Sequence, residues 1–163
     1  MTNKVIVFET KNFIVDVPQK PLVSREDGGH IRIIEKHNLE DRLLLAPAAA
    51  TELAWLTMLV GEAFKSVMIK SGVRIERLNY QDNGNWCYLK NEKPHLHVHI
   101  FGRTFESKAQ PLPNAMHLPL RSSGFYDNFN PLTENEIQDL KAEIKRLLCC
   151  DKYNTGNWKF NLS

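Results

Sequence analysis

The chain has 163 residues, which is enough for one domain with a real hydrophobic core. Apolar residues make up 42% and charged residues 25%, and this composition excludes a disordered or fibrous protein. The formal net charge is only +2, so the chain lacks the basic excess of nucleic-acid-binding domains. We therefore do not expect a nucleic-acid partner, although a small anionic ligand needs only a local site.

The cysteines and the most apolar window indicate where the protein works. Cys87, Cys149 and Cys150 form neither a disulfide framework nor a C-x-x-C pair, which indicates free thiols in the cytoplasm. The window from Leu43 to Gly61 is long enough for a membrane span, but it contains a proline and a glutamate. Because an interior carboxylate is costly in lipid, we interpret this window as a core helix and expect no membrane association.

The first half of the chain predicts three strands and one long helix. Val5–Glu9 and Phe13–Val17 are β-rich runs that predict a hairpin, and residues 30–36 predict a third strand. The period changes after these strands, and residues 39–46 predict a short helix. Apolar residues at spacing three and four then predict a helix from about Pro47 to about Lys70.

The second half alternates strands, turns and a final helix. The elements predicted there are a strand over 73–80, a turn at 83–84, a strand from 95 to about 103, an irregular stretch over 110–131 and a helix over about 133–149. Thr133 and Glu136 have the spacing of a capping box at the start of that helix. The terminal sequence TGNWKF predicts an aromatic anchor that docks on the body.

These elements predict an α+β fold, with a mostly antiparallel sheet of about five strands, one long helix and a C-terminal helix. No composition shift marks a domain boundary. We therefore expect a single domain over residues 1–163. Within it, residues 1–103 form the motif-bearing core, and residues 104–163 form a C-terminal extension packed on that core.

The stretch PHLHVHIFGR holds three histidines at spacing two: His95, His97 and His99. On a strand these side chains share one face, while the apolar residues between them face the core. Three interpretations are open. The strand could simply be a polar surface strand, it could bind a metal such as zinc through its imidazoles, or it could perform nucleophilic catalysis at phosphorus.

The sequence HLHVHIF resembles the signature of the histidine triad family, which is His, apolar, His, apolar, His and two apolar residues. The segments KPLV and GGHIRIIEKH also resemble the family's segment before and along the preceding strand. LNYQDNG resembles a family strand that carries an asparagine before a glycine turn. The resemblance covers roughly residues 5–103, and it implies a histidine-triad-like α+β fold.

The resemblance implies a nucleotidyl hydrolase or transferase. Such proteins cleave an α-phosphate bond of a nucleotide conjugate, for example a nucleoside phosphoramidate or a dinucleoside polyphosphate. The family uses no metal or other cofactor for this step and generally forms homodimers. We therefore expect a small nucleotide substrate, no cofactor, no metal and a homodimer. The alternatives are a nucleotide-binding protein with weak or lost catalysis and a metal-binding protein that uses the three histidines.

The resemblance also assigns roles to residues. His97 matches the family's nucleophile, His99 a phosphate contact, and His95 the residue that orients the nucleophile, partly through its backbone carbonyl. His37 matches a fourth histidine that supports the site from a neighbouring strand. Asn79 matches an asparagine near the phosphate and leaving group. Because His97 must be neutral to attack, we expect activity to fall at acidic pH, near an imidazole pKa of about 6.5.

Two positions depart from the family pattern. The segment before the histidines is NEKP, where many members have Gln or Ser, so we expect Asn91 to supply the polar contact to substrate. Pro18 stands where many members hold the ribose with Asp or Asn, and we expect Asp16 to substitute for it. His30 fits the histidine of the family's Gly-His segment, and we interpret it as structural.

Overall fold

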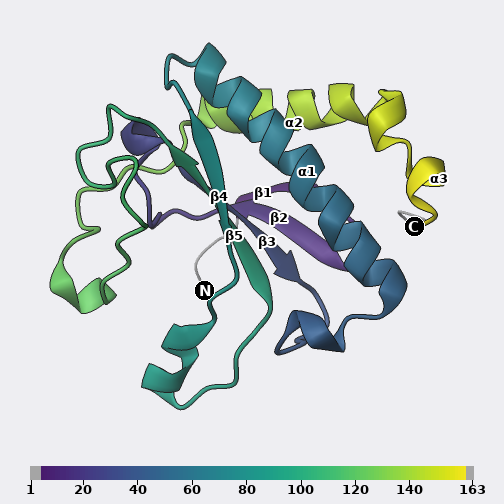
Figure 1. The fold of residues 1–163 in the computed structure, drawn as a ribbon, viewed down its shortest axis with the longest axis horizontal. Coiled ribbons are helices and arrows are strands. Elements are labelled where there is room, and N and C mark those ends of the chain that lie inside the picture. The colour runs from purple at the N-terminus through teal and green to yellow at the C-terminus, as the bar shows by residue number, and fades with distance from the viewer. Residues whose placement is uncertain (1–4, 161–163) are drawn as a thin grey trace.

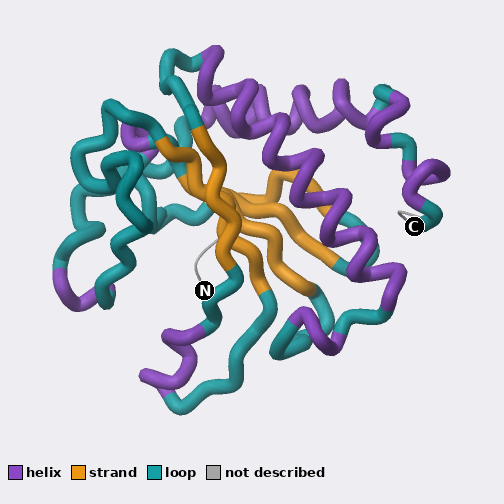
Figure 2. The backbone as a smooth tube through the Cα atoms, in the orientation of Figure 1, coloured by secondary structure: helices purple, strands orange, loops and turns teal. Residues whose placement is uncertain are grey.

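The computed structural model describes residues 5–160, so the ends of the predicted domain, 1–4 and 161–163, lie outside the described residues. Five strands form one antiparallel sheet in the order β1-β2-β3-β5-β4. They are β1 (Val5–Glu9), β2 (Phe13–Val17), β3 (His30–Glu35), β4 (Arg77–Gln81) and β5 (His97–Arg103). The predicted α+β class and antiparallel sheet are confirmed, and Figure 2 shows the strands gathered in a single sheet.

The long helices are α1 (Pro47–Lys70) and α2 (Glu134–Leu148), and a single short turn, α3 (Thr155–Trp158), follows. Both long helices were predicted at these bounds to within a residue. α1 has proline in its first turn, where the missing N–H costs no hydrogen bond. α2 opens on the predicted capping box, in which Thr133 and Glu136 satisfy each other's backbone N–H groups. Figure 1 shows α1 lying across the sheet with α2 behind it.

One apolar cluster fills the space between the sheet and the helices. It draws side chains from β1, β2, β3 and β5, from α1 and α2, and from the end of the chain. The predicted terminal anchor is confirmed, because the ring of Phe160 packs edge-on against Trp55 with the centroids 5.2 Å apart. Residues of the C-terminal extension therefore share the core of the motif-bearing part. Among residues 5–160, no helix combines the length and the apolarity needed to cross a membrane.

Three strands differ in their bounds from the predictions, and hydrogen bonds explain the largest difference. The fourth strand begins at Arg77 rather than 73, because the N–H of Val73 donates to Met68 O and so finishes the turn that ends α1. The histidine strand spans His97–Arg103, so His95 precedes it. The third strand ends at Glu35.

The Asn83-Gly84 pair does not close a tight hairpin. Instead, Gly84 has a left-handed φ of 61° and leads into a 3-10 helix, η3 (Asn85–Lys90), between β4 and β5. The short helix predicted over 39–46 is a single 3-10 turn, η2 (Arg42–Leu44). The remaining 3-10 turns are η1 (Arg25–Asp27), η4 (Arg121–Ser123) and η5 (Asp151–Tyr153).

The irregular stretch after β5 was predicted as such, and in Figure 1 it forms the loops on the left of the view. Its start depends on a close backbone approach between two glycines. A Cβ on Gly102 would overlap the carbonyl oxygen of Gly28 and would come within 2.7 Å of Ile75 Cδ1. The N–H of Gly102 donates to Gly29 O, so this contact fixes where β5 meets the turn before β3.

Replacing Gly102 with alanine is therefore expected to lower the free energy of unfolding by about 2 kcal/mol or more, because backbone cannot move aside cheaply. Urea denaturation of Gly102→Ala and wild type measures this. Gly156→Ala is the matched control, since its new methyl would meet only an exposed asparagine side chain. Equal stability of both variants would contradict the packing argument.

Candidate functional site

We call His95, His97 and His99 the histidine row. This row lies on the sheet face that is turned away from α1. On β5, Val98 and Ile100 point into the core, so His97 and His99 point to the other face. The prediction of one polar and one apolar face is confirmed for this strand. The rings of His97 and His99 are 4.6 Å apart and nearly perpendicular.

The backbone of His95 fixes the tautomer of His97. His97 Nδ1 lies 2.7 Å from the carbonyl oxygen of His95. Because a carbonyl only accepts, the ring proton of a neutral His97 must be on Nδ1. The lone pair is therefore on Nε2, which has no protein partner among residues 5–160. This is the arrangement that a nucleophilic imidazole requires.

His95 is itself held at the end of β3. Its Nε2 donates to the carbonyl oxygen of Glu35 over 2.7 Å. The Glu35 side chain is buried, and its carboxylate accepts hydrogen bonds from the backbone N–H groups of His37 and Leu39. The turn after β3 is thus tied down next to the residue whose carbonyl orients His97.

A buried relay fixes the tautomer of His99. The N–H of Leu22 donates to His30 Nδ1 over 3.1 Å, so the His30 proton must be on Nε2. His30 Nε2 lies 2.9 Å from His99 Nδ1 and therefore donates to it. His99 consequently carries its own proton on Nε2. The result is a neutral N–H donor beside the lone pair of His97.

Burial keeps these imidazoles neutral. Desolvation lowers the pKa of His99 to about 3, and nearby His97, Arg32 and Arg121 act in the same direction. Burial also lowers the pKa of His30 well below its usual value. The pKa of His97 is lowered mainly by burial, while the hydrogen bond to the His95 carbonyl opposes this shift. His97 is thus an uncharged base at neutral pH.

The structure does not place His37 where the sequence-based prediction expected a fourth supporting histidine. His37 follows the end of β3, where its backbone N–H donates to Glu35 and its side chain is exposed. His30 pairs with Phe101 across β3 and β5, so its ring points to the histidine face and meets His99. The physical reason is strand alternation: only residues within β3 with the parity of residue 30 can reach this face.

Asp16 was expected to hold the ribose, but in the structure its carboxylate pairs with Arg32. Asp16 is 1% exposed, and both of its carboxylate oxygens accept hydrogen bonds from the Arg32 guanidinium, at 2.9 and 2.6 Å. Because this carboxylate is both buried and paired with Arg32, it is not accessible to ribose hydroxyls in this structure. Arg32 pairs with His99 across β3 and β5, so this ion pair sits on the histidine face.

The structure gives the positions of the two asparagines that were expected to contact substrate. Asn79 lies on β4 opposite Phe101, and its Oδ1 accepts a 2.6 Å hydrogen bond from buried Arg103. Gln81, rather than Asn79, pairs with His99. Asn91 is exposed after η3, with a left-handed φ of 55°, and it makes no side-chain hydrogen bond to a histidine.

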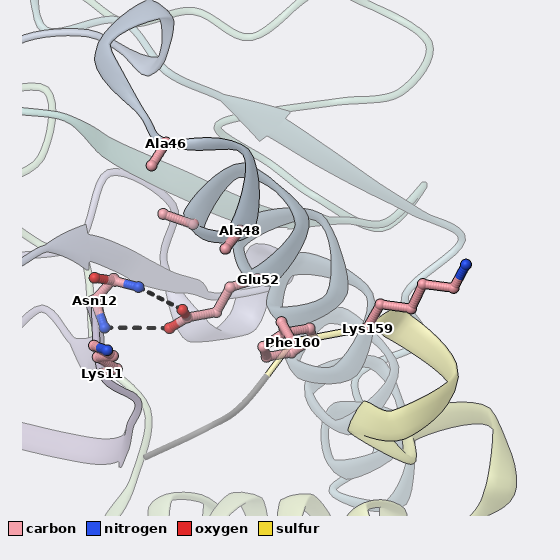
Figure 3. Close-up of a pocket in the computed structure, with 8 residues that line it drawn as sticks. Lys11, Asn12, Ala46, Ala48, Glu52, Lys159 and Phe160 are labelled. Atoms are coloured by element: carbon pink, nitrogen blue, oxygen red, sulfur yellow. Dashed lines mark hydrogen bonds between the residues drawn. The ribbon is translucent and has the colours of Figure 1, made fainter.

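One cavity lies away from the histidines. It has a volume of about 430 Å³ and is formed by the β1–β2 turn, the start of α1 and the end of the chain. Figure 3 shows its polar centre, where buried Glu52 accepts two hydrogen bonds from Asn12. No histidine lines it. Within residues 5–160, no group of three His, Cys, Asp or Glu side chains has an arrangement that could hold a metal ion.

Comparison with solved structures identifies this architecture. No family model and no curated protein sequence matches the chain. A hypothetical histidine triad nucleotide-binding protein from Sulfolobus tokodaii is 18% identical, with a TM-score of 0.58 over 90% of this chain and 87% of that chain. The chain has the histidine triad fold.

Two further structures have the same fold. A zinc-bound histidine triad family protein from Mycobacterium smegmatis is 18% identical, with a TM-score of 0.57 over 90% of this chain and 87% of that chain. A uridylyltransferase is 16% identical, with a TM-score of 0.52 over 90% of this chain and 42% of the larger chain. Enzymes and nucleotide-binding proteins thus share the histidine triad fold.

Three site features of this histidine triad fold were missing from the sequence-based prediction. His30 and Arg32 alternate with core isoleucines along β3, and this alternation was a usable signal for placing them on the histidine face. Arg121 had no such signal, because it comes from a loop of the extension.

The buried imidazoles predict how stability depends on pH. Below pH about 6.5 the unfolded chain protonates histidines that the folded chain keeps neutral, so the unfolded state binds more protons. The free energy of unfolding should therefore decrease as the pH falls from about 6.5 toward the His99 pKa of about 3. We expect His99→Gln to reduce this slope by up to about 1.4 kcal/mol per pH unit.

Urea denaturation at several pH values measures the slope. Exposed His37→Ala is the control, and it should leave the slope close to that of wild type. An unchanged slope in His99→Gln would show that His99 titrates normally in the folded protein.

Proposed function

We propose that the protein is a nucleotidyl hydrolase or transferase that acts on a nucleotide conjugate through a covalent intermediate on His97. The observation that carries this proposal is the hydrogen bond from His97 Nδ1 to the His95 carbonyl, which leaves the Nε2 lone pair facing outward beside a neutral N–H donor. The histidine triad fold and its uridylyltransferase neighbour support the same reaction class.

The first step forms the intermediate. His97 Nε2 attacks the α-phosphorus, a P–N bond forms, and the bond to the leaving group breaks with its electron pair. The imidazole then carries a positive charge, which the hydrogen bond from its Nδ1–H to the His95 carbonyl stabilises. The N–H at His99 Nε2 and the nearby arginine charges stabilise the negative phosphoryl oxygens.

The second step restores the enzyme. Water, or another nucleophile in a transferase, attacks the same phosphorus and releases a proton. The P–N bond breaks, and its electron pair returns to Nε2 of His97. Because His97 keeps its Nδ1 proton throughout, no tautomer change is needed between turnovers.

The proposal extends to the setting of the protein. We propose a cytoplasmic homodimer with a small nucleotide substrate, as expected from the free cysteines and the family resemblance. His95, His97, His99 and His30 form the proposed catalytic group. Asp16 and His37 are left out of the proposal, because Asp16 is buried in its ion pair with Arg32 and His37 is exposed after the end of β3.

Intact-mass spectrometry tests the intermediate. Wild type and His97→Ala are mixed rapidly with adenosine phosphoramidate and, separately, with diadenosine polyphosphates. We expect an adenylyl adduct and turnover in wild type, and a rate loss of roughly 10³-fold or more in the variant. Nucleotide binding without His97-dependent turnover would instead support a binding protein.

A chelator serves as the control for metal chemistry, which the zinc-bound neighbour raises as an alternative. Turnover that survives the chelator and disappears in His97→Ala fits the nucleotidyl-histidine reaction. Turnover that the chelator abolishes and zinc restores would contradict it.

His30 and His37 provide a second, independent comparison. Without His30, the His99 proton is free to occupy either nitrogen, so the donor is lost for part of the time. We expect His30→Gln to lower kcat by up to about 10²-fold and His37→Ala to leave kcat within about twofold of wild type. Steady-state kinetics measure both. A large effect of His37→Ala with none for His30→Gln would contradict the relay.

A further inference from the structure

Residues of the C-terminal extension contribute to an apolar cluster beside the histidine row, which we call the aromatic wall. A second apolar cluster on this face contains Leu22, Val23, Phe101 and Tyr126, with Trp86, Met116, Leu118, Phe125 and Phe129 packed against it. Phe101 stacks on His99, with ring centroids 5.4 Å apart and planes 9° from parallel. The wall therefore begins where the histidine row ends.

The guanidinium of Arg121 packs against two rings of this wall. Its guanidinium carbon lies 5.4 Å from the ring centroid of Tyr126 and 5.8 Å from that of Trp86. Its Nη2 donates to the carbonyl oxygen of Lys20 over 2.8 Å, two residues before the N–H that begins the relay to His99. These contacts hold the guanidinium in one orientation and leave most of its donors unused.

The charge of Arg121 has no counter-ion among the described residues. Among residues 5–160, no carboxylate lies within 4.0 Å of it, whereas Arg32 on the same face is neutralised by Asp16. Burial and the positive charge of Arg32 lower the pKa of Arg121, and Arg121 in turn lowers the pKa of His99. Arg121 is exposed, and its guanidinium, held beside the aromatic rings of Trp86 and Tyr126 without a carboxylate partner, is accessible to an anion from solvent.

We propose that Arg121 binds a phosphate of the leaving group and thereby sets the preferred substrate. Substrate would run along the row, with its attacked phosphorus at His97, phosphoryl oxygens at His99, and a further phosphate at Arg121. This rests on the proposed function. It selects nucleotide conjugates whose leaving group carries additional phosphate, such as dinucleoside polyphosphates, over phosphoramidates that release a neutral amine.

Steady-state kinetics on two substrates test the selection. We expect Arg121→Gln to lower kcat/KM for diadenosine tetraphosphate by roughly 10- to 100-fold, mainly through KM, which corresponds to losing hydrogen bonds to a charged group. The value for adenosine phosphoramidate should change by about threefold or less. Arg121→Lys should recover part of the loss, because lysine keeps the positive charge but lacks the planar guanidinium that donates two parallel hydrogen bonds.

Arg74→Gln is the control, since Arg74 is an exposed arginine that pairs with Glu76. It should change neither value. Circular dichroism and thermal melting check that the Arg121 variants fold. An equal loss on both substrates, or no loss on either, would overturn the proposal.

A binding measurement separates this inference from the catalytic one. In the His97→Ala background, titration calorimetry with diadenosine tetraphosphate and with AMP needs no turnover. Adding Arg121→Gln should weaken diadenosine tetraphosphate by about 10-fold and AMP by about threefold or less. That result would support the Arg121 site even if wild type formed no adduct. Failure of diadenosine tetraphosphate to bind, or equal weakening of both ligands, would overturn it.

Discussion

Antiparallel pairing of β3 with β5 sets Arg32 opposite His99 and His30 opposite Phe101. The contact between His30 and His99 follows from this register. A slip by one residue would turn the core isoleucines of β3 toward the histidines and bury His30 and Arg32 among the helices. Packing of the apolar face therefore fixes which polar side chains lie on the opposite face. Other registers would expose isoleucines and bury an arginine, which costs too much free energy.

The site relies on neutral imidazoles rather than on charged ones. Each tautomer is fixed by a partner that can only accept or only donate: a carbonyl for His95 and His97, and a backbone N–H for His30. In the proposed reaction, the positive charge that receives a phosphate comes from arginines instead. This division suits phosphoryl transfer, because a protonated His97 could not attack, whereas an arginine remains charged at every relevant pH.

The extension is joined to the sheet by buried polar contacts as well as by the aromatic cluster. Arg103, at the end of β5, is 2% exposed and donates to Asn79 and to the carbonyl oxygens of Gln110 and Asn114. Asp27 accepts the N–H groups of Lys108 and Ala109. These bonds place the loop of Arg121 on the histidine side of the sheet. Residues of the extension therefore contribute to the core and to the second apolar cluster beside His99.

The sequence by itself determined the elements and one face of the site. Alternation over β5 was enough to place His97 and His99 together, and capping and periodicity were enough for α1 and α2, because these signals are local in the chain. The start of β4 was wrong because the end of α1 uses the backbone of Val73. Only the tertiary structure decided that His30 rather than His37 lies on the histidine face, that Asp16 is buried in an ion pair with Arg32, and that Arg121 packs on Trp86 and Tyr126. Each of these depends on strand register or on a loop returning over about a hundred residues, and no local pattern encodes the distance between such groups.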